Sequence, residues 1–326
     1  MHHRILSIVV LALLAVGTAA ADHPDWENEK VIGRNKEAAH TWGIPYPNRG
    51  LALAMKRDRS PWFRSLNGDW KFHWSPSPEK RPKEFYQVDF DDSQWKLIPV
   101  PSNWQTEGFA IPLYSNITYP FEKDAPRVTT PPKDSSWTQA KYENQVGSYR
   151  RTFTVPRDWM ERVVYIQFDG VDSAFYLWVN GNKVGYSQGS RTPAEFNISK
   201  YLRPGENSLA VEVYQNCDGS YLEDQDLWRM SGIFRDVYLW SASSVHTQDY
   251  FVKTDLDASY KNALLQLEAT ISNLGDKSKD CTLKGELINN KGDTVVAIST
   301  GGTVEPGMTK LVTPCLLYTS PSPRDS

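Results

Sequence analysis

The chain has 326 residues, of which 40% are apolar and 23% are charged, proportions typical of folded proteins that exclude a disordered or fibrous chain. This length predicts about two domains. A net charge of −3 without a run of basic residues argues against nucleic acid as a partner, and three cysteines are too few for a disulfide scaffold.

Residues 1–21 are typical of a secretory signal peptide. Arg4 precedes the apolar run Ile5–Val16, and small residues that suit a cleavage site follow as far as Ala21. The run is short for a transmembrane helix, although a membrane anchor is the alternative interpretation. We therefore expect a secreted or periplasmic protein with no membrane association once the signal is removed.

Short segments in which apolar and polar residues alternate follow an irregular stretch that ends near residue 65, and this alternation is the pattern of β-strands. The predicted strands are Trp70–Trp74, Tyr149–Val155, Val163–Phe168, Ala174–Val179, Lys183–Tyr186, Ser208–Tyr214 and Ile233–Trp240. Asn180 and Gly181 predict a hairpin with a type I′ turn, because both residue types tolerate positive φ. Together these features predict an all-β fold, an antiparallel jelly-roll sandwich over residues 22–241.

The composition changes after Trp240, where aromatic residues become rare. Apolar residues alternate in the segments Ala263–Ile271, Leu283–Leu287 and Val295–Ile298, with turn residues between them. This pattern predicts a second, smaller sandwich of immunoglobulin type over residues 242–314, which we expect to be incomplete.

Two further expectations follow from this division. Cys217 and Cys281 fall in different predicted domains, so we expect no disulfide between them. Residues 315–326 show no alternation and are interpreted as a non-native tail, with a natural flexible tail as the alternative.

Aromatic residues are unusually frequent, with 12 Trp, 16 Tyr and 12 Phe. Flat rings suit stacking on sugars, but a large sandwich also buries many aromatic side chains in its core. The composition leaves both interpretations open.

The stretch Asp218–Arg229 is the most acidic part of the sequence. Its carboxylates belong to Asp218, Glu223, Asp224 and Asp226. Such a stretch forms a solvated loop, or it binds a hard cation or the hydroxyl groups of a sugar. Retaining glycosidases need two carboxyl groups about 5–5.5 Å apart, and the spacing of Glu223 and Asp226 does not favour such a pair.

Several motifs together carry a resemblance to a known family. They are Asp25–Asn28, Ser65–Trp70, Val100–Gln105, Tyr114–Pro120, Phe168–Phe175 and Asp218–Val237. Over about residues 25 to 312 the chain resembles the N-terminal region of the large β-galactosidases of glycoside hydrolase family 2. The Asn-Ile-Thr-Tyr-Pro stretch that begins at Asn116 favours this branch over the β-glucuronidases and β-mannosidases.

The resemblance implies a jelly-roll domain and an immunoglobulin-like domain, which in the family precede a TIM barrel and further sandwiches. Both catalytic glutamates of these retaining enzymes lie in the barrel. We therefore expect no catalytic residue in this chain and no activity of the chain alone, while the parent enzyme is expected to be a homo-oligomeric β-galactosidase acting on β-galactosides.

Family contacts also fall inside the chain. Asn116 corresponds to the asparagine that reaches the galactose pocket, and Asp226 to the aspartate that contacts a sugar hydroxyl and a sodium ion. The resemblance implies a magnesium site with oxygen ligands, formed by Asp25, Asn28, the Val31 carbonyl, Gln188 and Asp218. Two alternatives remain open: a stand-alone carbohydrate-binding module, or a family 2 enzyme such as a β-glucuronidase or β-mannosidase.

Overall fold

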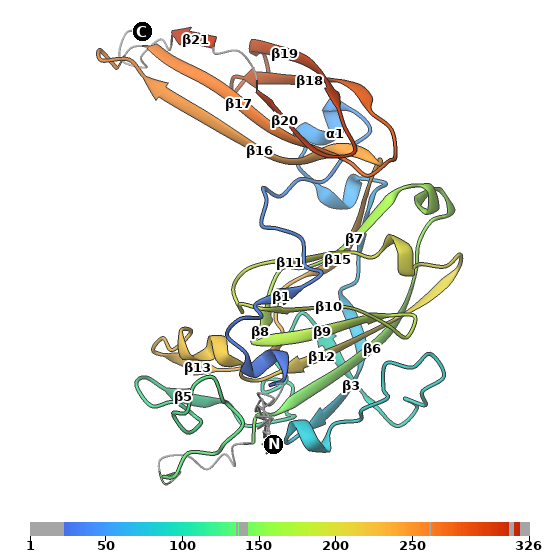
Figure 1. Cartoon of the computed structure of the whole chain (residues 1–326), viewed down its shortest axis with the longest axis vertical. Helices are drawn as coiled ribbons and strands as arrows, with labels where there is room; N and C mark the ends of the chain where they lie inside the picture. The colour runs from blue at the N-terminus through green and yellow to red at the C-terminus, as the bar shows by residue number, and fades with distance from the viewer. Residues whose placement is uncertain (1–22, 135, 137–142, 261, 313–315, 320–326) are drawn as a thin grey trace, which may run out of the picture.

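A computed structural model describes residues 23–134, 136, 143–260, 262–312 and 316–319. The predicted signal peptide and most of the predicted non-native tail lie outside these residues. The described chain is almost entirely β-structure and forms two units, a larger one that carries most strands and a smaller one above it in Figure 1.

The larger unit is a sandwich of two antiparallel sheets. Its seven-stranded sheet consists, in spatial order, of β1 (Gly33–Arg34), β10 (Asn182–Gln188), β9 (Ala174–Val179), β12 (Glu206–Tyr214), β6 (Val146–Thr154), β3 (Gly68–Ser75) and β4 (Lys96–Val100). The facing sheet consists of β11 (Ala194–Asn197), β7 (Val163–Phe168), β15 (Val237–Ala242) and β2 (Phe63–Ser65). The fold class predicted from alternation is therefore confirmed.

Short strand pairs and helical segments lie outside the two main sheets of the sandwich. Two small strand pairs are β5 (Leu113–Ser115) with β13 (Leu227–Arg229), and β8 (Val171–Asp172) with β14 (Gly232–Ile233). The helical segments are η1 (Asp25–Glu27), α1 (Arg49–Leu53), η2 (Arg57–Arg59), η3 (Pro78–Lys80), η4 (Arg157–Glu161), η5 (Ser199–Tyr201) and η6 (Asp218–Tyr221).

Apolar side chains fill the space between the two sheets. On β12, Leu209, Val211 and Val213 point into this core, as the alternation predicted, and they pack with large rings such as Trp70 and Phe168. Burying such surface stabilises a fold by roughly 25 cal/mol per Å².

The opposite face of the seven-stranded sheet is also covered. Tyr176, Tyr186 and Tyr214 are buried there, and Trp26 of the N-terminal segment stacks on Tyr214 with ring centroids 4.0 Å apart. Many of the aromatic residues therefore form core, and they attach the irregular N-terminal segment to the sandwich.

The predicted hairpin is confirmed. β9 and β10 are antiparallel neighbours, and Asn180 and Gly181 between them have φ values of 50° and 79°. The predicted strand Ile233–Trp240 is divided. Its first residue, Ile233, pairs with β8 as part of β14, and only the residues from Val237 onward join the sandwich as β15.

The smaller unit contains the long strands of the second predicted domain. β16 (Val245–Leu256), β17 (Asn262–Asn273), β20 (Gly307–Val312) and β21 (Leu316–Thr319) form one sheet, and β18 (Lys279–Ile288) pairs with β19 (Thr294–Val304). Between the two sheets lies an apolar groove of about 360 Å³, lined by residues such as Leu267 and Ile298. The strand β21 pairs with β17 and was not predicted from the sequence.

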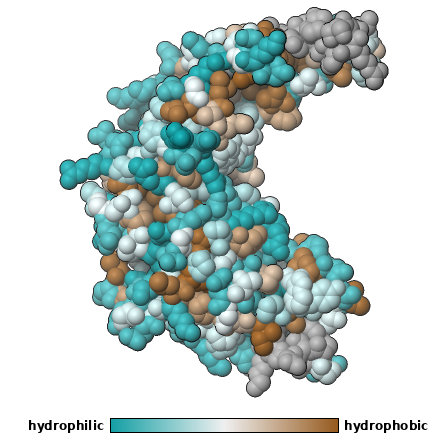
Figure 2. All heavy atoms as spheres, turned by 180° about the vertical axis from the view of Figure 1, so that it is seen from behind, coloured by the Kyte–Doolittle hydropathy of each residue, from teal (hydrophilic) through white to brown (hydrophobic). Residues whose placement is uncertain are grey.

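The N-terminal segment connects the two units. It leaves η1 at the base of the sandwich, runs up the side of the molecule and reaches the smaller unit at α1 (Figure 1), where Arg49 pairs with Glu286 on β18. Seen from behind, the molecule has a curved outline that is hollowed between the two units (Figure 2).

Cys217 and Cys281 are both free, as expected. None of the helices within the described ranges is long and apolar enough to cross a membrane.

Candidate functional site

The small sheet β5–β13 brings the two expected sugar-contact residues together. Leu227 on β13 pairs with Ser115 on β5, so Asp226 and Asn116 are the next residues outward on each strand. Both side chains are exposed at this end of the ladder. The structure therefore places a carboxylate and an amide side by side, although they are 110 residues apart in sequence.

Two aromatic residues share this surface. Tyr114 and Trp228 are opposite each other on β5 and β13, both are exposed, and their ring centroids are 5.7 Å apart. The Tyr114 hydroxyl donates a hydrogen bond of 2.5 Å to Oδ1 of Asp226. We call the exposed surface formed by Tyr114, Asn116, Asp226 and Trp228 the β5–β13 face.

The other carboxylates of the acidic stretch have structural partners. Glu223 accepts hydrogen bonds from the backbone N–H and the hydroxyl of Ser190, at 2.8 and 2.5 Å. Asp224 forms an ion pair with Arg229, which also donates to the carbonyl of Glu223. These contacts hold the loop between η6 and β13 against the sandwich and leave Asp226 at the surface.

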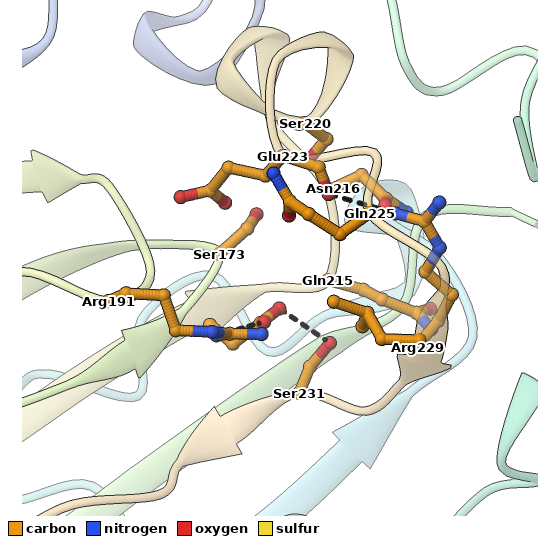
Figure 3. Close-up of a pocket in the computed structure, with 11 residues that line it drawn as sticks. Ser173, Arg191, Gln215, Asn216, Ser220, Glu223, Gln225, Arg229 and Ser231 are labelled. Carbon is orange, nitrogen blue, oxygen red and sulfur yellow. Dashed lines mark hydrogen bonds and ion pairs between the residues drawn. The ribbon is translucent and has the colours of Figure 1, made fainter. Parts of the chain in front are cut away.

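A polar pocket of about 40 Å³ lies beneath this loop. Figure 3 shows Arg191 and Ser231 on one side of it and Glu223 and Gln225 on the other. Oε1 of Gln215, a buried residue, has no hydrogen-bond partner among the residues described. This volume suits two or three water molecules rather than a hexose ring.

A half-buried carboxylate lines this pocket. Asp172 accepts hydrogen bonds from Arg191 at 2.8 Å and from the hydroxyl of Ser231 at 3.4 Å. Burial raises the pKa of Asp172 to about 6, although the Arg191 guanidinium opposes this shift.

The residues implied as magnesium ligands also converge. Asp218 in η6 accepts a hydrogen bond of 3.3 Å from the amide of Gln188 at the end of β10, and η6 contacts η1. Oδ1 of Asp218 is buried and has no hydrogen-bond partner within the described part of the chain. Burial raises the pKa of Asp218, against the hydrogen bond from Gln188. An unpaired, buried carboxylate oxygen of this kind fits a cation ligand.

The other residues of the predicted set, Asp25, Asn28 and Val31, lie in the N-terminal segment. Val31 donates its backbone N–H to the Asn28 carbonyl, and the backbone N–H of Gln188 donates to the carbonyl of Ile32, so the segment lies beside the end of β10. Asp25 has other partners: Arg34 binds it through both Nε and Nη2, and Tyr176 donates its hydroxyl at 2.9 Å.

The contacts of Asp25 determine its charge state. Burial raises its pKa, but the hydrogen bonds from Arg34 and Tyr176 outweigh burial and hold the pKa below the ordinary value. In the described ranges no cluster of three or more His, Cys, Asp or Glu side chains is arranged to hold a metal. A magnesium site here would thus depend on amide and carbonyl oxygens beside two carboxylates.

Sequence reasoning assigned no individual role to Tyr114, Arg34 or Glu27. Glu27 in η1 accepts hydrogen bonds from the backbone N–H groups of Val128 and Thr129 and so ties the N-terminal segment to a distant loop. Strands of three residues such as β5 and β13 are too short for alternation to reveal them. The one local signal is Trp228, which lies within the acidic stretch.

Comparison with protein families places these features in context. Residues 63–243 match the family model described as glycosyl hydrolases family 2, sugar binding domain. The matched range covers the strands of the sandwich except β1, and it includes the β5–β13 face and the polar pocket.

Curated relatives of this chain are named β-galactosidases. The chain is 46% identical over 258 residues to "Beta-galactosidase" of Priestia megaterium, covering 78% of this chain and 24% of the relative. It is 44% identical over 275 residues to "Beta-galactosidase 2" of Enterobacter cloacae, covering 83% of this chain and 24% of the relative. The chain thus spans about a quarter of the length of these relatives.

Solved structures agree with the fold. A Bacteroides uniformis β-glucuronidase superimposes with a TM-score of 0.63 at 21% identity, covering 80% of this chain and 28% of that one. A putative β-galactosidase from Bacteroides fragilis gives 0.59 at 19% identity, covering 80% and 36%. At these identities the likeness concerns the fold alone.

Proposed function

Because this chain belongs to glycoside hydrolase family 2, we propose that it is the sugar-binding, N-terminal part of a retaining β-galactosidase that removes terminal, non-reducing β-D-galactose residues from β-galactosides. The observation that carries the proposal is the position of Asn116 beside Asp226 on the β5–β13 face. A carboxylate accepts hydrogen bonds from sugar hydroxyls, and an amide both donates and accepts, so the pair suits a hexose.

We assign catalysis to a part of the enzyme outside this chain. A retaining mechanism needs an acid and a nucleophile about 5–5.5 Å apart. In the acidic stretch, Glu223 is held by Ser190 and Asp224 by Arg229, so neither serves as a free acid or nucleophile. In this proposal the chain contributes contacts to the sugar, and the glutamates of the barrel perform the reaction.

Two cations are included in the proposal. A sodium ion bound by Asp226 would place a hard cation on the same carboxylate that contacts the sugar. Magnesium at Asp218, Gln188, Asn28, the Val31 carbonyl and Asp25 would tie the N-terminal segment to the sandwich. The free Oδ1 of Asp218 supports this second site, and Arg34 would have to release part of its hold on Asp25.

The remaining parts of the proposal concern the whole enzyme. The apolar run near the N-terminus supports export to the periplasm or the medium. A homo-oligomeric assembly is proposed from the resemblance to the large β-galactosidases.

The test begins with the transcript or genomic sequence beyond residue 314. We expect an open reading frame that continues into a barrel with two glutamates. The extended protein should hydrolyse p-nitrophenyl β-D-galactoside faster than the corresponding β-D-glucuronide and β-D-mannoside.

Either of two results would overturn the proposal. A reading frame that stops without a barrel would indicate a stand-alone binding module. Preference for the glucuronide or mannoside would assign the protein to another branch of the family.

A further inference from the structure

The β5–β13 face contains two aromatic residues whose role is not explained by packing. Tyr114 is 49% exposed and Trp228 is 57% exposed. The two residues that flank Tyr114 on β5, Leu113 and Ser115, point to the other face and are buried. Alternation along both strands therefore puts Tyr114, Asn116, Asp226 and Trp228 on the same exposed side.

The Tyr114 hydroxyl restrains the carboxylate of Asp226. Their contact is diagonal across the ladder, because Tyr114 pairs with Trp228 and reaches the residue two positions before it. The 2.5 Å hydrogen bond to Oδ1 leaves Oδ2 without a hydrogen-bond partner in the part of the chain that the structure describes. A carboxylate held by one oxygen presents the other in a defined direction.

Trp228 provides a flat apolar surface on the same exposed side of the ladder as Asp226. Its ring is tilted by 55° to that of Tyr114, so the two rings do not cover each other. The C–H groups on one face of a galactopyranoside form an apolar patch, because the axial O4 points to the other face. An indole beside a hydrogen-bonding carboxylate combines the apolar and polar contacts that a hexose needs.

We propose that Tyr114 is a positioning residue that orients Asp226, and that Trp228 is the stacking surface for the same sugar, a β-D-galactopyranoside. This inference deepens the function proposed above and rests on it.

The test measures binding of methyl β-D-galactopyranoside to the full chain by saturation-transfer NMR, with the glucoside as the epimer control. Tyr114→Phe should weaken binding about three- to tenfold, the loss expected for one hydrogen bond. Trp228→Ala should weaken it at least as much, and Trp228→Phe should restore part of the loss. Tyr260→Phe, at a tyrosine that is 79% exposed on the smaller unit, is the matched control and should bind as wild type.

A second measurement reads the positioning directly. In the wild-type chain, methyl β-D-galactopyranoside should shift the ¹³C resonance of the Asp226 carboxyl group, and Tyr114→Phe should reduce this shift at saturating sugar. An unchanged sugar-induced shift in Tyr114→Phe would overturn the positioning role.

The outcomes separate this inference from the proposed function. Wild-type binding that Asp226→Asn abolishes but Tyr114→Phe and Trp228→Ala leave intact would overturn the inference alone. Absence of galactoside binding by the wild-type chain would overturn this sugar subsite, whereas the proposed function is judged separately by hydrolysis with the extended protein.

Discussion

Nε2 of His40 lies 3.0 Å from Oε1 of Glu195, so a residue of the N-terminal segment contacts β11 across 155 residues of sequence. The other oxygen of Glu195 accepts a hydrogen bond of 2.7 Å from the Trp240 indole. The next residue, Thr41, donates its backbone N–H to Asp249 on β16. The segment around His40 is thereby attached to the sandwich and to the smaller unit.

This contact predicts a pH-dependent stability. The hydrogen bond with Glu195 raises the pKa of His40 from 6.5 to about 9, against burial, and Asp249 adds to the shift. The charged and titratable groups that face this region also include Glu37 and His246. A histidine whose pKa is higher in the folded than in the unfolded protein stabilises the fold when it is protonated. This stabilisation is fully present below the unfolded-state pKa of 6.5, and it is lost as the pH rises through about 9.

We expect His40→Gln to lower the free energy of unfolding by about 1–2 kcal/mol at pH 6, a value reduced for solvent screening. The difference from wild type should disappear by about pH 10. Urea unfolding at several pH values measures it, with His23→Gln at an exposed histidine as the control. A constant difference across this range would exclude the ion pair as its cause.

Magnesium should protect the N-terminal segment from proteolysis. A ligand that binds only the folded site stabilises it increasingly as free ion concentration rises. Cleavage within residues 22–40 should therefore be slow with magnesium and fast in a chelator, and Asp218→Ala should make it fast under both conditions. Limited proteolysis with mass mapping of the N-terminal fragments records this.

The structure supplies a competing anchor for the same segment. Trp26 stacks on Tyr214, and Glu27 binds the loop at Val128 and Thr129, and neither contact needs an ion. Identical cleavage patterns with and without magnesium would mean that these contacts suffice and that the metal site does not form.

Asp226 and Asp224 should differ in the kind of damage that their substitution causes. In the extended enzyme, Asp226→Asn should reduce kcat/KM by roughly 30- to 1000-fold, or ~2–4 kcal/mol, because a charged partner of a sugar hydroxyl is removed. Asp224→Asn should change kcat/KM much less. Instead it should lower the free energy of unfolding by about 1–3 kcal/mol, because the largely buried Arg229 loses its partner.

Steady-state kinetics and thermal unfolding of both variants distinguish these effects. Equal losses of kcat/KM at the two positions would show that the sugar-facing carboxylate has been wrongly identified.

The chain by itself should not hydrolyse aryl β-galactosides. The carboxylates Glu223 and Asp224 are engaged by Ser190 and Arg229, and no acid–nucleophile pair has been assigned to the described residues. A fluorogenic β-galactoside assay on purified chain, compared with a mock purification from the same host, measures this. Turnover above the mock value that persists in a host lacking its own β-galactosidase would contradict the expectation.

The strands of the sandwich could be predicted because their signal is local. A strand such as Ser208–Tyr214 alternates on its own, and Asn180-Gly181 adopts the turn that its residue types allow. The acidic stretch was likewise visible from composition. The division of Ile233–Trp240 between β14 and β15 could not be predicted, because periodicity does not indicate which strand each part will pair with.

The sequence by itself determined the all-β class, the hairpin and the resemblance that singled out Asn116 and Asp226. Only the tertiary structure decided that Asp25 is held by Arg34 and Tyr176, that Glu223 and Asp224 support a loop, and that Tyr114 reaches Asp226. The physical reason is that alternation depends on burial of one face, which nearby residues share. The contacts of Tyr176 with Asp25 and of Tyr114 with Asp226, 151 and 112 positions apart, instead depend on which segments become neighbours in the whole fold. Alternation does not predict the nearer partners of Asp25, Glu223 and Asp224 either, because these side chains lie in loops and short helical turns.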